Sequence, residues 1–266
     1  MFWNVDGSYE IFQKRNFIPT KEIILNHYLY LIVDLSCLLG PLLLSFHPRL
    51  HLYKRWKSIL LGMLVMMAVF IPWDIFFTKN NIWHFSNEYT LGFKILELPI
   101  EEWLFFICVP FACIFTFEVI VSYFPKKPSR LFTQLISFIL IVISIALSIS
   151  YFNHWYTLSA SATCVVLLTY HTWKKSEFLG HFYIAWAFLQ LPFFISNGVL
   201  TGLRFWDYPF INTSKIEVVN AIVYYNNSHN LGLRIWSVPA DDFFYGLVMV
   251  LLALTVYKRH WVTSNQ

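Results

Sequence analysis

The chain has 266 residues and a formal net charge of +4, and 58% of its residues are hydrophobic while only 13% are charged. Soluble domains contain about 45–50% apolar and about 25% charged residues, so this composition excludes an ordinary soluble protein. The cations lie in loops and form no basic stripe, which argues against a nucleic-acid partner.

Residues 1–26 form a polar and aromatic N-terminal segment without the basic region, apolar core and cleavage site of a signal peptide. Seven apolar runs follow, and a transmembrane helix needs about 20 such residues. In chain order the runs cover 27–47, 58–77, 99–123, 131–151, 155–171, 180–200 and 239–257. The sequence therefore predicts an all-α fold, a polytopic membrane helix bundle with about seven transmembrane helices.

Lysine and arginine residues concentrate in the short loops after the first, third and fifth runs and around the C-terminal tail, 259–266. Positively charged loops tend to remain on the cytoplasmic side of a membrane. We therefore expect an integral, multi-pass protein of the cell membrane, with its N-terminus outside and its C-terminus in the cytoplasm.

Residues 91–102 resemble residues 231–242 at an offset of 140 residues (231 − 91). Leucine, glycine, isoleucine and proline are identical at matched positions, and a cation and a pair of acids also coincide. Because the offset places the third run on the seventh, it predicts two parallel three-helix repeats. The predicted units are a first repeat at 27–125, a linking helix at 126–151 and a second repeat at 152–258. An additional polar stretch at 205–230 is either a lid or a tolerated loop insertion.

Two pairs of adjacent acids, Glu101 with Glu102 and Asp241 with Asp242, each follow a proline at the start of a predicted span. The predicted spans contain no lysine or arginine, and an ionised carboxylate at the bilayer centre costs at least about 2.5 kcal/mol. A carboxyl group that keeps its proton there is a Brønsted acid. Neighbouring residues on a helix point about 100° apart, so one acid of each pair can face a cavity while the other caps free N–H groups. The alternative is that all four are ordinary first-turn acids satisfied by the helix N-termini.

The chain is also rich in aromatic residues, with 27 Phe, 15 Tyr and 11 Trp. They form either lipid-facing bulk with interfacial belts, or a groove for a long apolar ligand. In such a groove, a cation over a ring face gains about 0.5 to 2 kcal/mol, which would stabilise a carbocation. The sequence has no glycine-rich nucleotide loop and few close histidines, so we expect neither a cofactor nor a metal.

The sequence around the acids resembles a known family. Three segments are similar to the first half of the small integral-membrane lycopene cyclases. They are Trp-Asp-Ile at 73–75, Trp-His-Phe at 83–85 and Leu-Pro-Ile-Glu-Glu-Trp-Leu-Phe-Phe at 98–106. Segments 192–202 and 239–246, with Asn226, are similar to the second half. The family includes heterodimeric forms, fused forms and the cyclase part of a fungal bifunctional lycopene cyclase/phytoene synthase. The second motif usually reads Pro-x-Glu-Asp, and the shorter Asp241 here makes Glu101 the stronger candidate for the proton donor.

This resemblance implies a lycopene β-cyclase that converts the ψ ends of lycopene into β rings, giving γ-carotene and β-carotene. The reaction is an isomerisation, in the class of intramolecular lyases, with no cofactor, no metal and no net redox change. It implies acid and base roles for Glu101, Glu102, Asp241 and Asp242. Candidate substrate-binding residues are Trp73, Asp74, Trp103, Phe105, Phe106, Asn197, Asn226, Phe243, Phe244 and Tyr245. The expected partners are lycopene, other linear carotenoids and the lipid bilayer, and contact with other carotenoid enzymes stays open. The competing interpretation is a non-enzymatic, proton-coupled membrane carrier of hydrophobic molecules.

Overall fold

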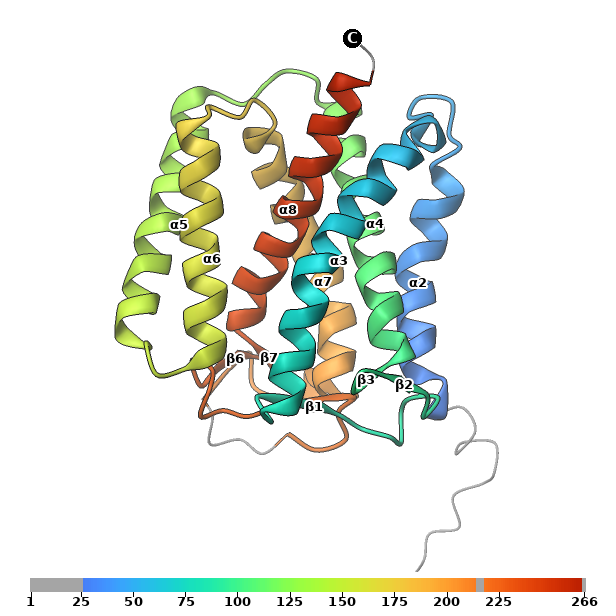
Figure 1. The fold of residues 1–266 in the computed structure, drawn as a ribbon, viewed down its shortest axis with the longest axis vertical. Coiled ribbons are helices and arrows are strands. Elements are labelled where there is room, and N and C mark those ends of the chain that lie inside the picture. Colours follow the sequence, from blue (N-terminus) through green and yellow to red (C-terminus); the bar gives the residue numbers. More distant parts are fainter. Residues whose placement is uncertain (1–25, 214–217, 265–266) are drawn as a thin grey trace, which may run out of the picture.

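The structure is a computed structural model that describes residues 26–213 and 218–264, so nearly all of the predicted N-terminal segment lies outside the described residues. Its seven α-helices run alternately up and down in one bundle (Figure 1). They are α2 (Leu29–Leu44), α3 (Trp56–Lys79), α4 (Ile100–Tyr123), α5 (Arg130–Ser150), α6 (Trp155–Trp173), α7 (Leu179–Thr201) and α8 (Asp241–Thr263). Two 3-10 helices, η1 (Leu52–Arg55) and η2 (Phe205–Asp207), lie in loops. The predicted all-α helix bundle is confirmed.

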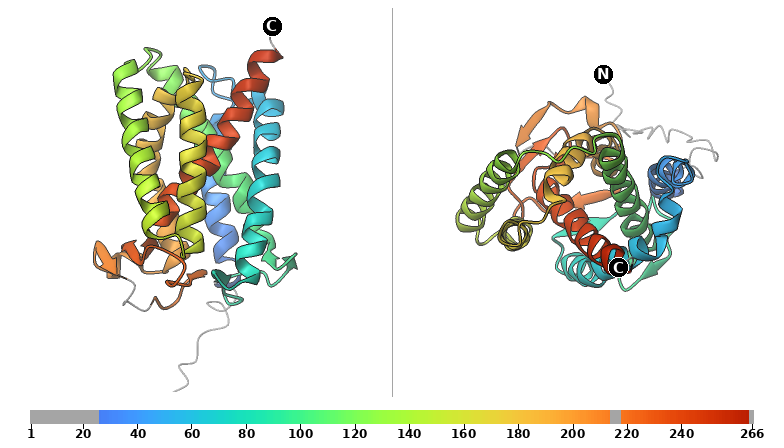
Figure 2. Two further views of the ribbon diagram at one scale, coloured as in Figure 1. Left: turned by 60° about the vertical axis from the view of Figure 1, so that its left-hand side comes forward. Right: turned by 90° about the horizontal axis from the view of Figure 1, so that it is seen from above.

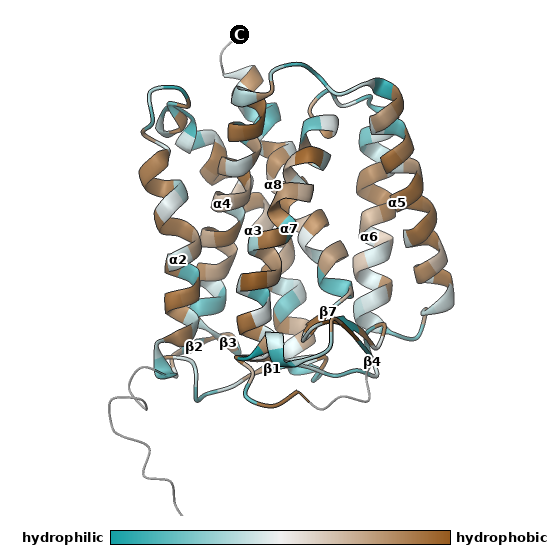
Figure 3. Cartoon of the chain, turned by 180° about the vertical axis from the view of Figure 1, so that it is seen from behind, coloured by the Kyte–Doolittle hydropathy of each residue, from teal (hydrophilic) through white to brown (hydrophobic). Residues whose placement is uncertain are grey.

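Four segments are long and apolar enough to cross a membrane, namely Leu52–Lys79, α4, α5 and α7. Helix α2 is apolar but shorter. Apolar residues predominate along the helices, as the brown colouring in Figure 3 shows, and many large apolar side chains are exposed. These features support a membrane protein, whereas the number of spans and the orientation remain predictions.

Short strands and loops cover one end of the bundle, and we call this region the strand cap (Figures 1 and 2). Its strands are β1 (Trp83–Phe85), β2 (Lys94–Ile95), β3 (Leu98–Pro99), β4 (Ile211–Thr213), β5 (Val223–Tyr225), β6 (Leu233–Ile235) and β7 (Val238–Pro239). Strands β1 and β5 form one antiparallel ladder, β2 and β3 form a hairpin, and β4 pairs with β6, which pairs with β7. Helices α4 and α8 both begin at this cap, so the first turns that carry the acid pairs lie beneath it.

The strand cap has the predicted internal repeat. The β2–β3 hairpin pairs Lys94 with Pro99, and at the offset of 140 residues β6–β7 pairs Arg234 with Pro239. In the ladder, strands β1 and β5 from the two repeats pair with each other, and His84 lies opposite its own counterpart Tyr224. The backbone hydrogen bonds at the two ends of the ladder are also related by the offset of 140. Ser86 N donates to Ile222 O (2.8 Å), and Asn226 N donates to Ile82 O (2.9 Å). The two parallel repeats are therefore related by an approximate twofold axis through this ladder, while the exact unit boundaries remain a prediction.

The insertion at 205–230 forms part of the strand cap. Its β4 strand adds to the β6–β7 hairpin, whereas β5 is the repeat counterpart of β1, with which it forms the ladder. In the first repeat only residues 80–82 separate α3 from β1, whereas residues 202–222 separate α7 from β5. The second repeat therefore carries the larger share of the cap.

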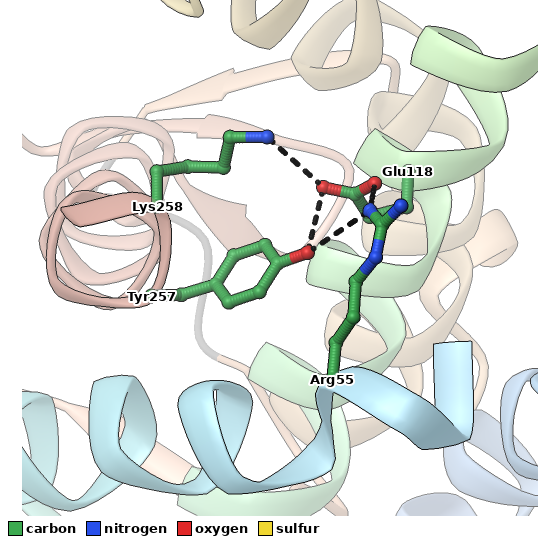
Figure 4. Close-up of polar contacts among 4 residues, drawn as sticks. All are labelled: Arg55, Glu118, Tyr257 and Lys258. Atoms are coloured by element: carbon green, nitrogen blue, oxygen red, sulfur yellow. Dashed lines mark hydrogen bonds and ion pairs between the residues drawn. The ribbon is translucent and has the colours of Figure 1, made fainter. Parts of the chain in front are cut away.

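An ion-pair network around the buried Glu118 joins the helices at the opposite end of the bundle (Figure 4). Glu118 of α4 pairs with Arg55 and Lys258, and it accepts a hydrogen bond of 2.9 Å from the hydroxyl of Tyr257. Arg55 is the last residue of η1, directly before α3, and the other two partners lie on α8. Glu118 and Lys258 are themselves at matched repeat positions (258 − 118 = 140), so this ion pair joins the two repeats.

Candidate active site

A cavity of about 490 Å³ lies between α2, α4, α7 and α8, beneath the β1–β5 ladder. Its wall is mainly apolar and aromatic, and Glu102 and Asp242 are the two acids among the residues that line it. Glu102 lies in the first turn of α4, and Asp242 lies in the first turn of α8. The cavity therefore receives one carboxyl group from each repeat.

The first acid pair divides between the cap and the cavity. Glu101 is fully buried, and its Oε1 accepts a hydrogen bond of 2.6 Å from the backbone N–H of Leu91, which fixes the loop before β2. Glu102 lies next to the cavity and accepts a hydrogen bond from the hydroxyl of Tyr30 on α2. Glu101 is not among the cavity-lining residues, which does not favour it as the proton donor.

The second acid pair divides in the same way. Asp241 accepts hydrogen bonds from the backbone N–H of Leu231 (3.0 Å) and from the hydroxyl of Thr157 (2.5 Å), so it anchors the loop before β6. The Leu91–Glu101 and Leu231–Asp241 bonds are related by the repeat offset. Thus only the second acid of each pair lines the cavity, while the first acid of each pair bonds to the cap.

Asp242 is held by three hydrogen-bond donors. The hydroxyl of Tyr156 lies 2.6 Å from Oδ1, and Oδ2 accepts bonds from Asn197 Nδ2 (2.7 Å) and from the hydroxyl of Tyr225 (3.2 Å). Tyr225 belongs to the cap, where burial, followed by the nearby Asp242 carboxylate, raises the pKa of its phenol well above the ordinary value. Tyr225 therefore remains a neutral donor to this carboxylate.

Glu102 has a different environment, because a second carboxyl group lies beside it. Asp74 of α3 interacts with Glu102, and its Oδ1 accepts a hydrogen bond of 2.6 Å from the indole Nε1 of Trp83. Its other carboxylate oxygen, Oδ2, is buried as well. The two acids of the cavity thus differ in their surroundings, with a carboxyl neighbour at Glu102 and three neutral donors at Asp242.

Three of the predicted substrate-binding residues line the cavity, namely Phe105, Asn197 and Tyr245. Asp74 and Trp73 lie one layer behind: Asp74 contacts Glu102, and the ring of Trp73 lies 5.3 Å from that of Tyr245 in an edge-to-face contact. These five residues are therefore at the candidate site or in direct contact with it.

The other predicted substrate-binding residues are not among those that line the cavity. Trp103 donates from its indole to Ile95 O (3.3 Å), and Asn226 donates to Asn81 O (3.2 Å), so both stabilise the cap. Phe106 is fully buried in the core. Phe243 packs on Trp186 and on Phe244. Direct substrate contact is consequently less favoured for this group.

Sequence reasoning missed the hydroxyl donors Tyr30, Tyr156 and Tyr225. Tyr30 and Tyr156 are the second residues of α2 and α6, which are the first helices of the two repeats. Each donates a hydrogen bond to the cavity acid of its own repeat. Their backbone N–H groups also make matched bonds, to Tyr89 O (3.2 Å) and His229 O (2.9 Å). The two tyrosines are 126 residues apart in the sequence (156 − 30), so the offset of 140 does not pair them. In an apolar run that is rich in aromatic residues, neither tyrosine stands out as a hydrogen-bond donor.

The described residues include no group of three or more His, Cys, Asp or Glu side chains arranged to hold a metal ion. The chemistry that the site itself offers is proton transfer between carboxyl groups in an apolar cavity lined by aromatic rings. A carboxylic acid can donate a proton to a double bond, and a carboxylate can remove one from a carbocation.

Comparison with known proteins gives a family for this arrangement. The model of the family described as lycopene cyclase matches residues 27–120 and 153–260, which is well over half of the chain. The two matched parts contain α2–α4 without the last residues of α4, and α6–α8 without the last residues of α8. Glu102 and Asp242 lie in different matched parts.

Two curated fungal proteins named bifunctional lycopene cyclase/phytoene synthase are similar to part of the chain. The protein of Aspergillus niger is 30% identical over 82 residues, and that of Pyrenophora tritici-repentis is 33% identical over 86 residues. Each match covers 29% of this chain and only 14% of the relative, so the chain spans a small part of the length of these relatives. No solved structure matches the chain. On the strength of the family match over both repeats, the chain belongs to the lycopene cyclase family.

Proposed function

We propose that this protein is a lycopene β-cyclase, which converts the ψ ends of lycopene into β rings to give γ-carotene and β-carotene. The observation that carries this proposal is the pair of matched carboxyl groups, Glu102 and Asp242, in one largely apolar cavity. A cyclisation through carbocations needs an acid, a base and a site from which water is excluded. The family match over both repeats supports the same activity.

In this proposal Glu102 is the acid. Two neighbouring carboxyl groups shielded from water repel each other when both are ionised, so Asp74 and Glu102 favour sharing a proton. Of these two residues, Glu102 lines the cavity and Asp74 lies behind it. Glu102 is therefore the group that presents the proton to a bound double bond, and Asp74 is a positioning residue.

Asp242 is the base. Its carboxylate accepts hydrogen bonds from Tyr156, Asn197 and Tyr225, and donors of this kind stabilise the ionised form of a carboxyl group. A carboxylate already surrounded by donors is ready to accept a proton from a carbocation without a change in its surroundings. This preorganisation is what an electrostatic site contributes to catalysis.

The reaction then follows in three steps. Glu102 transfers its proton to the terminal double bond of lycopene, which leaves a positive charge on the tertiary carbon. The next double bond attacks that carbon, closes the ring and moves the charge to a ring carbon. Asp242 removes a proton from the neighbouring carbon, whose bonding electrons form the ring double bond. One proton has moved from Glu102 to Asp242, and its return to Glu102 completes the cycle without net redox change and without a cofactor.

Aromatic rings would stabilise both carbocations. Trp83, Phe105 and Tyr245 line the cavity with the two acids. A cation over an aromatic face gains about 0.5 to 2 kcal/mol, and a dry wall prevents water from adding to it. The abundance of aromatic residues in the chain thus has a use beyond contact with lipid.

We also infer that the protein is a multi-pass protein of the cell membrane, with its N-terminus outside and its C-terminus in the cytoplasm. The apolar helices and the bias of the loop charges support this orientation. The acids would then lie toward the outer face, where α4 and α8 begin. The substrate, a linear carotenoid, dissolves in the same bilayer.

Expression in a lycopene-producing bacterium tests the proposal. Red cells should turn orange-yellow, and chromatography of the pigments should show monocyclic and bicyclic products with β rings. Cells that make the membrane-inserted protein and retain only lycopene would contradict the cyclase and leave the carrier as the alternative. A strict need for reduced flavin in the purified enzyme would contradict the cofactor-free mechanism.

A further inference from the structure

The cavity continues away from the acids as a long groove on α4. Its residues on this helix run from Glu102 through Val109 to Thr116. At about 1.5 Å per residue, the separation of 14 positions (116 − 102) corresponds to about 21 Å along the helix axis. A ring alone needs only the end of such a groove, whereas an extended chain fills its length.

Helices α2 and α7 form the two sides of this groove. Cys37 and Pro41 of α2 line it on one side, and Pro192, Ile195 and Ser196 of α7 line it on the other. Cys37 lies close enough to Ser196 for a side-chain hydrogen bond across the gap. These residues form the rim of the groove on α2 and on α7.

The rim is open to the outside of the bundle. Ile195 lines the cavity although its side chain is 52% exposed, and the exposed residue Ser36 also lines it from α2. The neighbouring outer surface is apolar, with exposed side chains such as Leu35 and Leu39 on α2 and Leu191 on α7. Figure 3 shows many apolar residues, in brown, along both helices. An opening here faces the hydrocarbon of a bilayer.

Other directions are closed by packed side chains. The ladder covers the cavity with Trp83 and Val223, both of which are buried. On the side of α3 and α8, the rings of Phe70 and Trp73 lie 5.1 Å and 5.3 Å from that of Tyr245. Access from water through the cap would need separation of the β1–β5 ladder. Access between α2 and α7 needs no such separation.

We propose that the cavity opens sideways into the bilayer through a portal between α2 and α7, rimmed by Ser36, Cys37, Ile195 and Ser196. A linear carotenoid enters by this portal with one end first. Its reacting end lies at Glu102 and Asp242, and the rest of its chain lies along α4 and out between the two helices. The inference rests on the proposed cyclase activity for the identity of the substrate, but the portal itself is a property of the cavity.

A disulfide across the rim tests the portal. The substitution Ser196→Cys places a second thiol beside Cys37, and oxidation would join α2 to α7 over the opening. The turnover of the oxidised variant should be at least about tenfold lower than that of the same variant after reduction, because a closed portal blocks exchange of substrate and product. Reduction of the same sample should restore the activity.

A matched control uses another helix pair. Cys164 of α6 lies beside Ser144 of α5, away from the cavity, so Ser144→Cys provides a comparable disulfide that does not cross the portal. Oxidised Ser144→Cys protein and oxidised unmodified protein should both retain their activity. Loss of activity in these controls would show a general effect of oxidation and contradict the portal.

A second readout does not depend on catalysis. Purified Ser196→Cys protein is oxidised either before or after loading with lycopene, and the retained pigment is measured by its absorbance after washing. Oxidation first should exclude lycopene, and oxidation last should trap it. Equal retention in both orders, unchanged turnover of the cross-linked form, or failure of the two thiols to cross-link would overturn the proposal. If the unmodified protein lacks cyclase activity but shows this trapping, the portal stands and the proposed function fails.

Discussion

Glu102 and Asp242 are separated by the repeat offset (242 − 102 = 140) and face one cavity from different halves of the chain. Each accepts a hydrogen bond from a tyrosine in the first turn of the first helix of its own repeat, Tyr30 or Tyr156. The remaining neighbours differ, because Glu102 contacts the carboxyl group of Asp74 and Asp242 contacts Asn197 and Tyr225. A repeated framework has thus acquired two unequal acids, as a reaction with one proton donor and one proton acceptor needs.

Replacement of Glu102 by Gln should reduce turnover by at least about 100-fold, the lower limit for a positioned general acid. The amide keeps the size of the side chain but has no acidic proton to donate. Rates are measured in liposomes with lycopene, after the amount of folded protein has been matched.

Glu101→Gln is the matched control for that variant. Its amide oxygen can still accept the hydrogen bond from the N–H of Leu91, and the residue does not line the cavity. We expect its turnover to stay within about tenfold of the unmodified protein, below the effect of a lost general acid. Near-normal turnover of Glu102→Gln, with a large loss in Glu101→Gln, would reverse the assignment of the acid.

Asn197→Ala should slow the reaction by about 10-fold to 100-fold, because a hydrogen bond to a charged group is worth about 1.5–3 kcal/mol. The variant removes one of the three donors to Asp242. Tyr156→Phe removes another and should have an effect in the same direction. Since both act through one carboxylate, the double variant should differ from the sum of the single effects. A strictly additive double variant would mean that they act on separate steps.

Glu118→Gln should lower the thermal stability of the protein and leave the chemistry of the cavity intact. The variant removes the only acid of the network with Arg55 and Lys258, so two cations lose their partner. Because both cations are partly solvated, we expect a loss of about 1–2 kcal/mol, less than for a fully buried pair. Unfolding in detergent, followed by light scattering or fluorescence, measures this loss.

Lys127→Ala serves as the control for Glu118→Gln. Its ion pair with Glu177 is exposed at both partners, with side chains that are 64% and 79% exposed. Exposed pairs contribute about 0–1 kcal/mol, so this variant should melt close to the unmodified protein. Equal melting temperatures of both variants and the unmodified protein would contradict a structural role for the Glu118 network.

Gly62→Ala should destabilise the contact between α3 and α8. A Cβ atom at this position would lie 2.5 Å from the carbonyl oxygen of Ala253, a backbone atom that cannot turn aside. Overpacking of this kind costs about 1–3 kcal/mol. Gly40→Ala on α2 is the control, because its Cβ would have no atom within 4 Å. Unchanged unfolding of Gly62→Ala would show that the helices separate easily there.

The helix bundle could be predicted from the sequence because the apolar runs have the length that a helix needs to cross a bilayer. The predicted third run, 99–123, differs by one residue from α4, Ile100–Tyr123. The repeat was also predictable, since Leu91, Gly92 and Pro99 recur with the acids at one offset. In both repeats these residues lie in or next to a hairpin and the first turn of the following helix.

The cap and the division of each acid pair were harder to predict. Strands β1 and β5 have three residues each and lie in different loops, so no periodic pattern identifies them. The choice between Glu101 and Glu102 depends on the rotation of α4 relative to the cavity, which spacing alone leaves open. In the sequence Lys258 is only a cation at the end of the last apolar run, but in the structure its long side chain reaches back to Glu118.

The most direct measurement is pigment analysis of cells that express the two halves of the chain, separated in the loop near Pro128 or after Tyr151, on either side of α5. The cavity needs Glu102 from one half and Asp242 from the other. Co-expressed halves should therefore convert lycopene into carotenoids with β rings, while each half alone, although present in the membrane, should leave only lycopene. Cyclic products from either half alone would contradict a single site shared by the two repeats.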